Sequence, residues 1–197
     1  MKKKIVIFNG PPGSGKNELA EHLEAFYCNT LNCIHLEMKS RLVAFALCIS
    51  GLSQTEWDEL YTKELKEVKS DKLFGKSPRE FLITISENCI KPYFGSDYFS
   101  IASIQQFEES GCDVAFYSDG GFDVELDCMV DKYGDSNVMV VKLYREGCSF
   151  DNDSRSYFNR TSHLYCVNIY NTGTLDFAKS LAVEMTSDFL RGGVADV

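Results

Sequence analysis

The sequence lacks the features that would mark a secreted, zinc-binding or membrane-spanning protein. None of its eight cysteines forms a C-x-x-C pair and several lie in apolar runs, which predicts reduced, mostly buried thiols. No apolar run approaches the ~20 residues that a membrane-spanning helix needs. Only four apolar residues follow the N-terminal lysines, which is too short a run for a signal peptide. We therefore expect a cytoplasmic protein without a membrane partner.

Positive charge is also scarce, because 20 Lys and Arg residues stand against 29 Asp and Glu residues. The formal net charge of −9 makes nucleic acid a poor candidate for the main ligand. A phosphate-bearing ligand would have to be held by a few well-placed cations instead of a general positive field. The three histidines, His22, His35 and His163, show no metal-binding spacing.

Short apolar strands alternate with amphipathic helices along the 197 residues, without internal repeats or low-complexity tracts. Strands are predicted at 4–8, 33–38, 113–119, 137–144 and 165–171. Helices are predicted at 16–27, 39–50, 53–70, 76–90, 97–110, 122–134 and 175–191. The first helix places Leu19, Leu23 and Phe26 on one apolar face. This alternation predicts a single α/β domain with a mainly parallel sheet between helices.

Two of the helix starts carry a specific N-terminal signal. Ser53 precedes Glu56 by three residues, and Ser77 precedes Glu80 by three, so both pairs predict a capping box. Pro78 would occupy the first helical position of the second of these helices. By contrast, the polar segment 145–163 has no periodicity and predicts a loop or a lid.

The segment GPPGSGKN, residues 10–17, follows the first strand and opens the first helix. Gly10, Gly15 and Lys16 fit the phosphate-binding pattern G-x-x-x-x-G-K in its required strand–loop–helix context. Glycine lets the backbone wrap closely around phosphate oxygens, helix amides point at the anion, and lysine adds a positive charge. The residues predicted to contact a nucleotide here are Gly13, Ser14, Gly15, Lys16, Asn17 and Glu18.

Asn17 stands where the pattern usually has Ser or Thr, whose hydroxyl ligates Mg²⁺. Three interpretations stay open from the loop alone. The amide oxygen ligates the ion directly, it acts through water with carboxylates elsewhere, or the site binds nucleotide without turning it over.

Four motifs in chain order resemble the phage-type deoxynucleoside monophosphate kinases. They are the loop GPPGSGKN and the segments KSPREFL (76–82), FYSDGGFDVELD (116–127) and YCVNIYNTGTLDF (165–177). The resemblance spans nearly the whole chain and implies a P-loop three-layer sandwich that transfers the γ-phosphate of ATP to a deoxynucleoside monophosphate with Mg²⁺. It also implies acceptor-binding helices over about 39–110, a lid over about 145–163, and the host cytoplasm if the source is viral. A homodimer stays open.

This sequence departs from the family's pattern at two positions that touch the chemistry. The family commonly has Asp where this chain has Asn17, and it often has Arg where this chain has Gly121. Another cation would then have to cover the charge at position 121, or the acceptor is a different molecule. The departures keep two alternatives open, a P-loop kinase for another small acceptor and a nucleotide-binding protein without activity.

The resemblance and the chemistry together suggest roles for individual residues. Catalytic roles are predicted for Lys16, Arg79, Asp119 and Arg155, and metal binding for Asn17 and Asp119. The predicted substrate-binding residues are Lys39, Arg41, Arg79, Asp119, Glu125, Arg145 and Arg160. Asn171 is expected near the adenine of ATP. Each also has a plainer interpretation, as a solvated surface charge, a helix cap or a turn residue.

Overall fold

Two compact units make up the chain in the computed structural model, which describes residues 2–151 and 153–192. The first unit comprises Met1–Met38 and Ser103–Val197, and the second comprises Lys39–Ala102. Asn152, which belongs to the predicted lid, lies outside the described residues. The helices predicted to bind an acceptor fall largely in the second unit, and that role stays a prediction.

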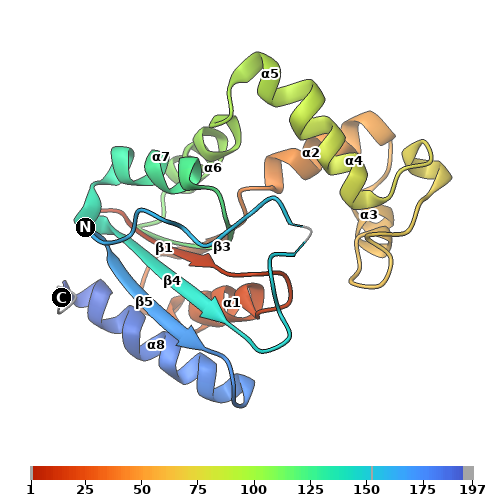
Figure 1. The fold of residues 1–197 in the computed structure, drawn as a ribbon. Helices are drawn as coiled ribbons and strands as arrows, with labels where there is room; N and C mark the ends of the chain where they lie inside the picture. Colours follow the sequence, from red (N-terminus) through yellow and green to blue (C-terminus); the bar gives the residue numbers. More distant parts are fainter. Residues whose placement is uncertain (1, 152, 193–197) are drawn as a thin grey trace. The chain divides into compact units, whose positions relative to one another are not determined.

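A five-stranded parallel sheet forms the centre of the first unit, in the order β2–β3–β1–β4–β5 (Figure 1). The strands are β1 (Lys4–Asn9), β2 (Cys33–Leu36), β3 (Val114–Gly120), β4 (Val138–Tyr144) and β5 (Tyr165–Tyr170). The predicted α/β sandwich of P-loop type is confirmed. After β3 the chain crosses over β1 to reach β4, so β1 marks the switch point at which such sheets bind ligands beyond their carboxyl ends.

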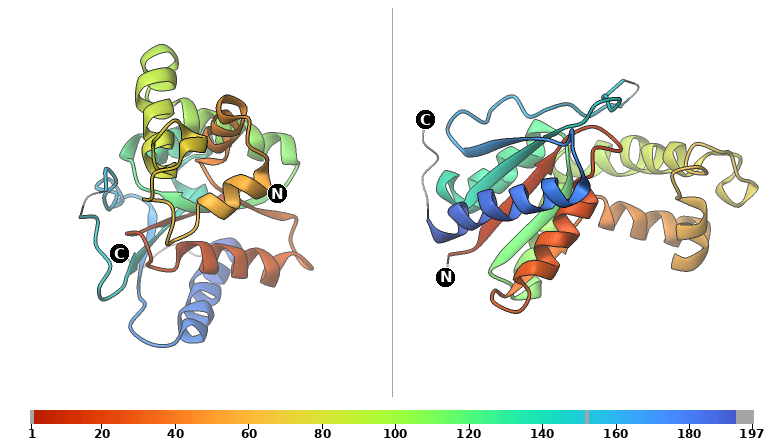
Figure 2. Two further views of the ribbon diagram at one scale, coloured as in Figure 1. Left: turned by 90° about the vertical axis from the view of Figure 1, so that its right-hand side faces the viewer. Right: turned by 90° about the horizontal axis from the view of Figure 1, so that it is seen from below.

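Helices cover both faces of this sheet, because successive side chains of each strand point to opposite faces. Helices α1 (Lys16–Tyr27) and α8 (Leu175–Arg191) pack side by side on one face, as both views of Figure 2 show. Helix α7 (Asp123–Tyr133) and the part of α6 (Tyr98–Ser110) within the first unit pack on the other face.

The apolar face predicted for α1 is right in two of its three residues. Leu19 and Leu23 are fully buried, but Phe26 is 53% exposed, so that part of the prediction is wrong. Tyr27 is buried in its place, and its ring stacks on Phe116 of β3 at a centroid distance of 6.1 Å. Tyr27 follows Leu23 by four residues, so it continues the buried face at the next turn of the helix.

The segment between β4 and β5 is irregular in its described part, as predicted. Because β4 and β5 are parallel, this connection must return from the carboxyl end of the sheet to its amino end. It does so over the face that carries α7, where Phe158 and Leu164 join the apolar core. Lys142 of β4 donates to the Phe158 carbonyl at 2.8 Å and holds the return path to the sheet.

The second unit is helical. Its elements are α2 (Ser40–Ser50), α3 (Gln54–Leu60), η1 (Asp71–Leu73), α4 (Pro78–Thr84), the π-helix η2 (Ile85–Ile90) and α5 (Lys91–Phe94). Both predicted capping boxes are present, at Ser53 with Glu56 and at Ser77 with Glu80. The core of this unit contains Trp57, Leu73, Phe81, Leu82 and Ile85.

The helix predicted over 53–70 is wrong in its second half, because α3 ends at Leu60. Trp57 is the buried side chain of α3, and the Lys- and Glu-rich stretch that follows offers no apolar face to bury. The hydroxyl of Thr62 accepts the N–H of Leu65 at 3.2 Å, which favours a turn over a helix. The alternating Lys and Glu residues after Leu60 therefore do not continue α3 as a helix.

None of the eight cysteines, all of which the structure describes, forms a disulfide, and the prediction that most are buried is wrong. Cys28, Cys48 and Cys89 are exposed and the other five are intermediate. Cys48 lies on α2, where Ala46 is the buried residue, so the apolar run around Cys48 forms a helix with only one covered stripe. In the described part of the chain, no helix has both the length and the apolar character to cross a bilayer.

Candidate active site

The loop after β1 forms a backbone cradle for an anion. Gly13 and Gly15 have φ values of 79° and 102°, in the left-handed region that side chains disfavour. The cradle opens at the N-terminus of α1, where unpaired amides and the helix dipole favour a negative group. The Ser14 hydroxyl is fully buried and has no hydrogen-bond partner among the described residues. A phosphate oxygen fits this set of donors.

The ammonium group of Lys16 lies over the same loop. Its Nζ donates to the carbonyls of Gly10 at 2.7 Å and of Pro11 at 2.8 Å, and the side chain is largely buried. Asn171 bonds to the loop, since its Nδ2 donates to the Ser14 carbonyl at 3.1 Å, and its predicted place near adenine stays a prediction. A methyl group at Gly15 would approach this amide to 3.2 Å. Asn171 therefore fixes the shape of the cradle.

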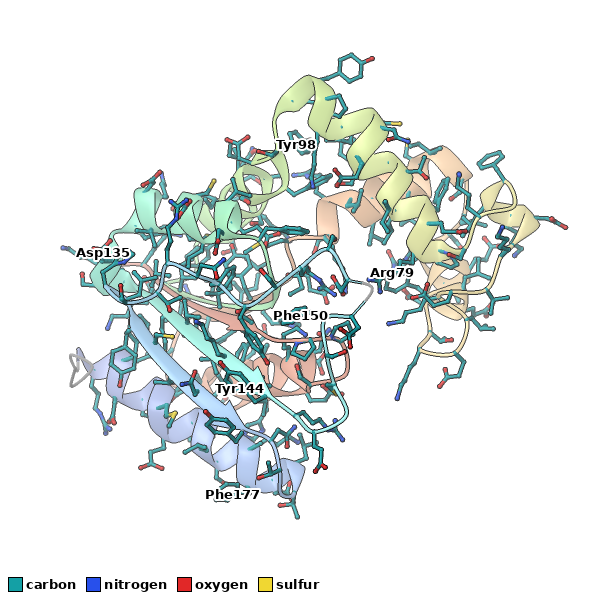
Figure 3. All side chains as sticks on the ribbon, in the orientation of Figure 1. Arg79, Tyr98, Asp135, Tyr144, Phe150 and Phe177 are labelled. Carbon is teal, nitrogen blue, oxygen red and sulfur yellow. The ribbon has the colours of Figure 1, made fainter. Side chains whose placement is uncertain are left out.

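An aromatic cavity of about 470 Å³ adjoins the loop at Pro11. Tyr144 and Phe150, both labelled in Figure 3, line it together with Tyr157 and Tyr170. The Tyr144 ring stacks on Tyr157 at 4.6 Å and on Tyr170 at 5.0 Å between centroids. Burial raises the pKa of Tyr157 to about 12, so this phenol stays neutral at physiological pH. Stacked rings of this kind suit a flat heterocycle.

Arg145 links the cavity to the phosphate loop. It lines the cavity, and its Nη1 donates to the Gly13 carbonyl at 2.9 Å. The side chain is exposed, so its remaining donors can reach solvent or a ligand. The structure thus brings this predicted substrate-binding arginine to the loop.

Asn17 faces a carboxylate that the sequence analysis did not single out. Its Nδ2 lies 2.9 Å from Oε1 of Glu37, the residue directly after β2. The negative charge that position 17 lacks is therefore present one hydrogen bond away. Among the described residues, no three His, Cys, Asp or Glu side chains form a metal-binding group by themselves. Kinase-type Mg²⁺ sites use one or two carboxylates with nucleotide phosphates, and Asn17, Glu37 and Asp119 offer oxygens of the right kind.

Asp119 and Glu125 form an acidic pair at the carboxyl end of β3. Asp119 Oδ1 accepts the N–H of Met38 at 2.8 Å, and the residue is 9% exposed. Glu125 Oε2 accepts the backbone N–H groups of Gly121 at 2.9 Å and Phe122 at 3.0 Å. Burial, and secondly the charge of Asp119, raise the pKa of Glu125 to about 7 against the pull of these N–H groups. Glu125 can therefore gain or lose a proton near neutrality.

Arg155 brings a cation to this acidic pair. Its Nε and Nη2 donate to the two carboxylate oxygens of Asp153 at 3.0 Å and 2.8 Å, and the charges of Asp119 and Glu125 also act on it. The structure thus places Arg155, an arginine of the predicted lid, beside Gly121 and near the acidic pair.

Two further predicted residues, Arg160 and Glu18, belong to the first unit. Arg160 is exposed, and its Nη1 lies 3.3 Å from Oδ2 of Asp127 on α7. Glu18 is exposed in the first turn of α1, where its charge complements the helix dipole. Their predicted ligand roles stay predictions.

Three predicted acceptor-binding residues belong to the second unit. The Nζ of Lys39 lies 5.7 Å from the centre of the Tyr61 ring, and Arg41 is exposed on α2. Arg79, labelled in Figure 3, lies in the first turn of α4 with Nη1 3.5 Å from Oε1 of Glu67. This ion pair is long and partly exposed, so it adds little to stability, and the acceptor role of Arg79 stays a prediction.

Asn9 is a further residue of this site that the sequence analysis missed. It is fully buried at the carboxyl end of β1 and bonds to the segment that carries Arg155. A polar residue ending an otherwise apolar strand was the available signal, because a buried amide must find partners.

No family model and no curated protein matches the chain. Among solved structures, it is similar to an unliganded sugar kinase from Janibacter sp., with 10% identity, 98% of this chain and 99% of that chain covered, and a TM-score of 0.43. It is also similar to a protein of Thermus thermophilus, with 12% identity, 95% and 98% coverage, and a TM-score of 0.47.

Proposed function

We propose that the protein is a phosphotransferase that moves the γ-phosphate of ATP to a deoxynucleoside monophosphate. The observation that carries this proposal is the cradle at the end of the central strand. Left-handed Gly13 and Gly15, the ammonium of Lys16 and the buried hydroxyl of Ser14, which has no partner within 2–151 and 153–192, together offer donors for the phosphate chain of a nucleotide.

The aromatic cavity supports a nucleotide as the donor. It adjoins the cradle at Pro11, so a nucleotide with its phosphates in the cradle could place its base among Tyr144, Tyr157 and Tyr170. Arg145, which lines the cavity and bonds to Gly13, would contact the phosphates between them. Mg²⁺, when bound, would neutralise phosphate charge, and Asn17, Glu37 and Asp119 are the residues that would hold it.

Phosphoryl transfer then needs positioning and charge more than covalent help from the protein. An oxygen of the acceptor phosphate attacks the γ-phosphorus, the bond to the β–γ bridging oxygen breaks, and ADP leaves. Lys16 and Arg155 would stabilise the charge on the transferring group. Within the second unit, Arg79 is the residue we propose for the acceptor phosphate, because its planar fork suits two phosphate oxygens.

A second candidate is a P-loop kinase for another small acceptor, such as a modified nucleotide or a nucleoside. Gly121 favours it, because the family that the sequence resembles often has an arginine at that position. A nucleotide-binding protein without turnover is the third candidate, and Asn17 is the residue that favours it.

A coupled ADP-release assay with Mg²⁺ across the common deoxynucleoside and nucleoside monophosphates tests the proposal. We expect turnover with at least one deoxynucleoside monophosphate. Lys16→Ala should lower turnover by about a thousandfold, whereas Lys132→Ala, at an exposed lysine on α7, should leave it unchanged. ATP binding measured by calorimetry separates the candidates. Tight binding of ATP without turnover on any acceptor would reject the phosphotransferase and leave the nucleotide-binding protein.

A further inference from the structure

Gly121 is a glycine for reasons of space. A methyl group at this position would lie 2.6 Å from Cδ and 2.7 Å from Cβ and Cγ of Arg155. Such distances are far below van der Waals contact, so any larger residue at 121 must push the arginine stem away. The stem of Arg155 therefore occupies the volume that a side chain at 121 would fill.

Asn9 clamps the chain just after Arg155. Its Nδ2 donates to the Gly120 carbonyl at 3.2 Å and to the Ser156 carbonyl at 2.9 Å, while its Oδ1 accepts the N–H of Phe158 at 2.9 Å. One buried amide thus ties the end of β3 to the return segment. Both N–H donors of the Asn9 side chain are used, and its oxygen has one lone pair left. Asn9 therefore makes three of the four hydrogen bonds that its side chain can make.

The clamp is reinforced on both sides. The Ser156 N–H donates to the Gly121 carbonyl at 3.1 Å, and the Phe158 side chain is only 2% exposed in the core under α7. The backbone around Arg155 is therefore bonded to the carboxyl ends of β1 and β3.

The guanidinium end of Arg155 is held by a carboxylate in the geometry that also suits a phosphate. Asp153 pairs with it through two parallel bonds, and the side chain of Asp153 is only 3% exposed while that of Arg155 is 25% exposed. Arginine binds carboxylate and phosphate with the same two-pronged arrangement. The two N–H donors of Arg155 that now bind Asp153 are thus the pair that could bind a phosphate.

We propose that Asn9 and Gly121 are positioning residues that hold Arg155 at the carboxyl end of β3 as a preset phosphate-binding cation. The phosphate role rests on the proposed function, whereas the positioning role does not. When a phosphate group of the ligand arrives, it takes over the two bonds that Asp153 makes. Gly121 and Arg155 then form one functional unit assembled from separate parts of the chain.

The first experiment follows the Nε–H resonance of Arg155 by NMR, assigned with Arg155→Lys, and needs no turnover. We expect Gly121→Ala to shift or broaden this resonance, because the added methyl group displaces the stem. Gly173→Ala is the matched control, since a methyl group there meets only Phe177 at 3.9 Å. An unchanged resonance in folded Gly121→Ala would overturn the positioning role.

The same resonance reports the phosphate role when Mg²⁺ and inorganic tripolyphosphate are titrated into the protein. We expect a saturable shift in the wild-type protein that is weaker in Gly121→Ala. No shift at saturating tripolyphosphate, with binding verified by calorimetry, would overturn the phosphate role and leave Arg155 as a structural partner of Asp153.

Steady-state kinetics test the positioning role separately, because a residue that only stabilises the fold would not change kcat selectively. We expect Gly121→Ala to lower kcat by about tenfold to a hundredfold with little change in the KM for ATP, because a misplaced cation fails mainly in the transition state. In an Arg155→Met background, Gly121→Ala should cost less than about twofold, because the two act together. Fully additive losses would overturn the coupling. Absence of turnover in the wild-type protein would reject the proposed function alone, since the NMR outcomes stand independently.

Discussion

The carboxyl ends of β1 and β3 each present a cation, but they are built in different ways. At β1, Lys16 folds back onto Gly10 and Pro11 within a single loop. At β3, Arg155 arrives from the return segment between β4 and β5, and Asn9 fixes that segment across a sequence separation of 147 positions. The first site is local and the second depends on tertiary structure.

The difference teaches that the two sites tolerate change differently. A local loop keeps its shape as long as its own glycines and helix start remain. The β3 site depends on the sheet, on the hydrogen bonds of Asn9 and on the space at Gly121. A substitution far from Arg155 in the sequence can therefore displace Arg155 from the end of β3. The following substitutions test this contrast.

Lys16→Ala should have the largest effect, because it removes the cation of the β1 site. We expect turnover to fall by about a thousandfold, on the order of the losses seen when a charge-stabilising group is removed. Thermal unfolding checks separately that the variant is folded, because the bonds from Lys16 to the carbonyls of Gly10 and Pro11 are buried. Retained activity would contradict the assignment of the phosphate loop.

Asn9→Ala should disrupt the β3 site and lower the free energy of unfolding. It leaves the Phe158 N–H and the carbonyls of Gly120 and Ser156 without their partner. We expect the free energy of unfolding to fall by about 2–4 kcal/mol, measured by urea denaturation. Asn168→Ala on the edge strand β5 is the control, because Asn168 is exposed and should cost less than about 0.5 kcal/mol. Equal losses at the two positions would argue against a clamp.

Glu125→Gln should change how the free energy of unfolding depends on pH, because Glu125 belongs to the β3 site. The pKa of Glu125 is raised from 4.5 to about 7 in the fold, so the folded state binds the proton that the unfolded state has already lost in this range. The free energy of unfolding therefore falls as pH rises from 4.5 to 7, by about 3 kcal/mol from this group. Glu125→Gln should remove this part of the pH dependence in urea titrations without added metal. The exposed Glu184→Gln should leave it intact.

Asn17→Ala should have the smallest effect, because Glu37 supplies a carboxylate beside it. We expect the Mg²⁺ concentration for half-maximal turnover to rise by up to about tenfold, and Glu37→Gln to raise it at least as much. If Asn17→Ala leaves the Mg²⁺ dependence untouched while Glu37→Gln changes it, the carboxylate is the ligand and the amide only orients it.

Much of the fold was predictable because its signals are local. Both capping boxes, the irregular segment before β5 and the bounds of α1 and α8 followed from short patterns. The errors arose where burial against distant parts of the chain determines whether a helix forms or a side chain is covered. The charged stretch after Leu60 had nothing to bury, Phe26 faced solvent although apolar, and the cysteines followed helix faces that composition does not reveal.

By itself, the sequence determined the phosphate cradle, since residues 10–16 contain its glycines, its cation and the helix start that completes it. Only the tertiary structure decided what surrounds the cradle. Strand order brought Glu37 to Asn17, the parallel pairing of β4 and β5 stacked Tyr144 on Tyr170, and the buried amide of Asn9 set Arg155 over Gly121. The physical reason is that neighbouring residues determine local torsional preferences and short-range hydrogen bonds. Packing volumes and buried polar partners exist only after distant segments meet.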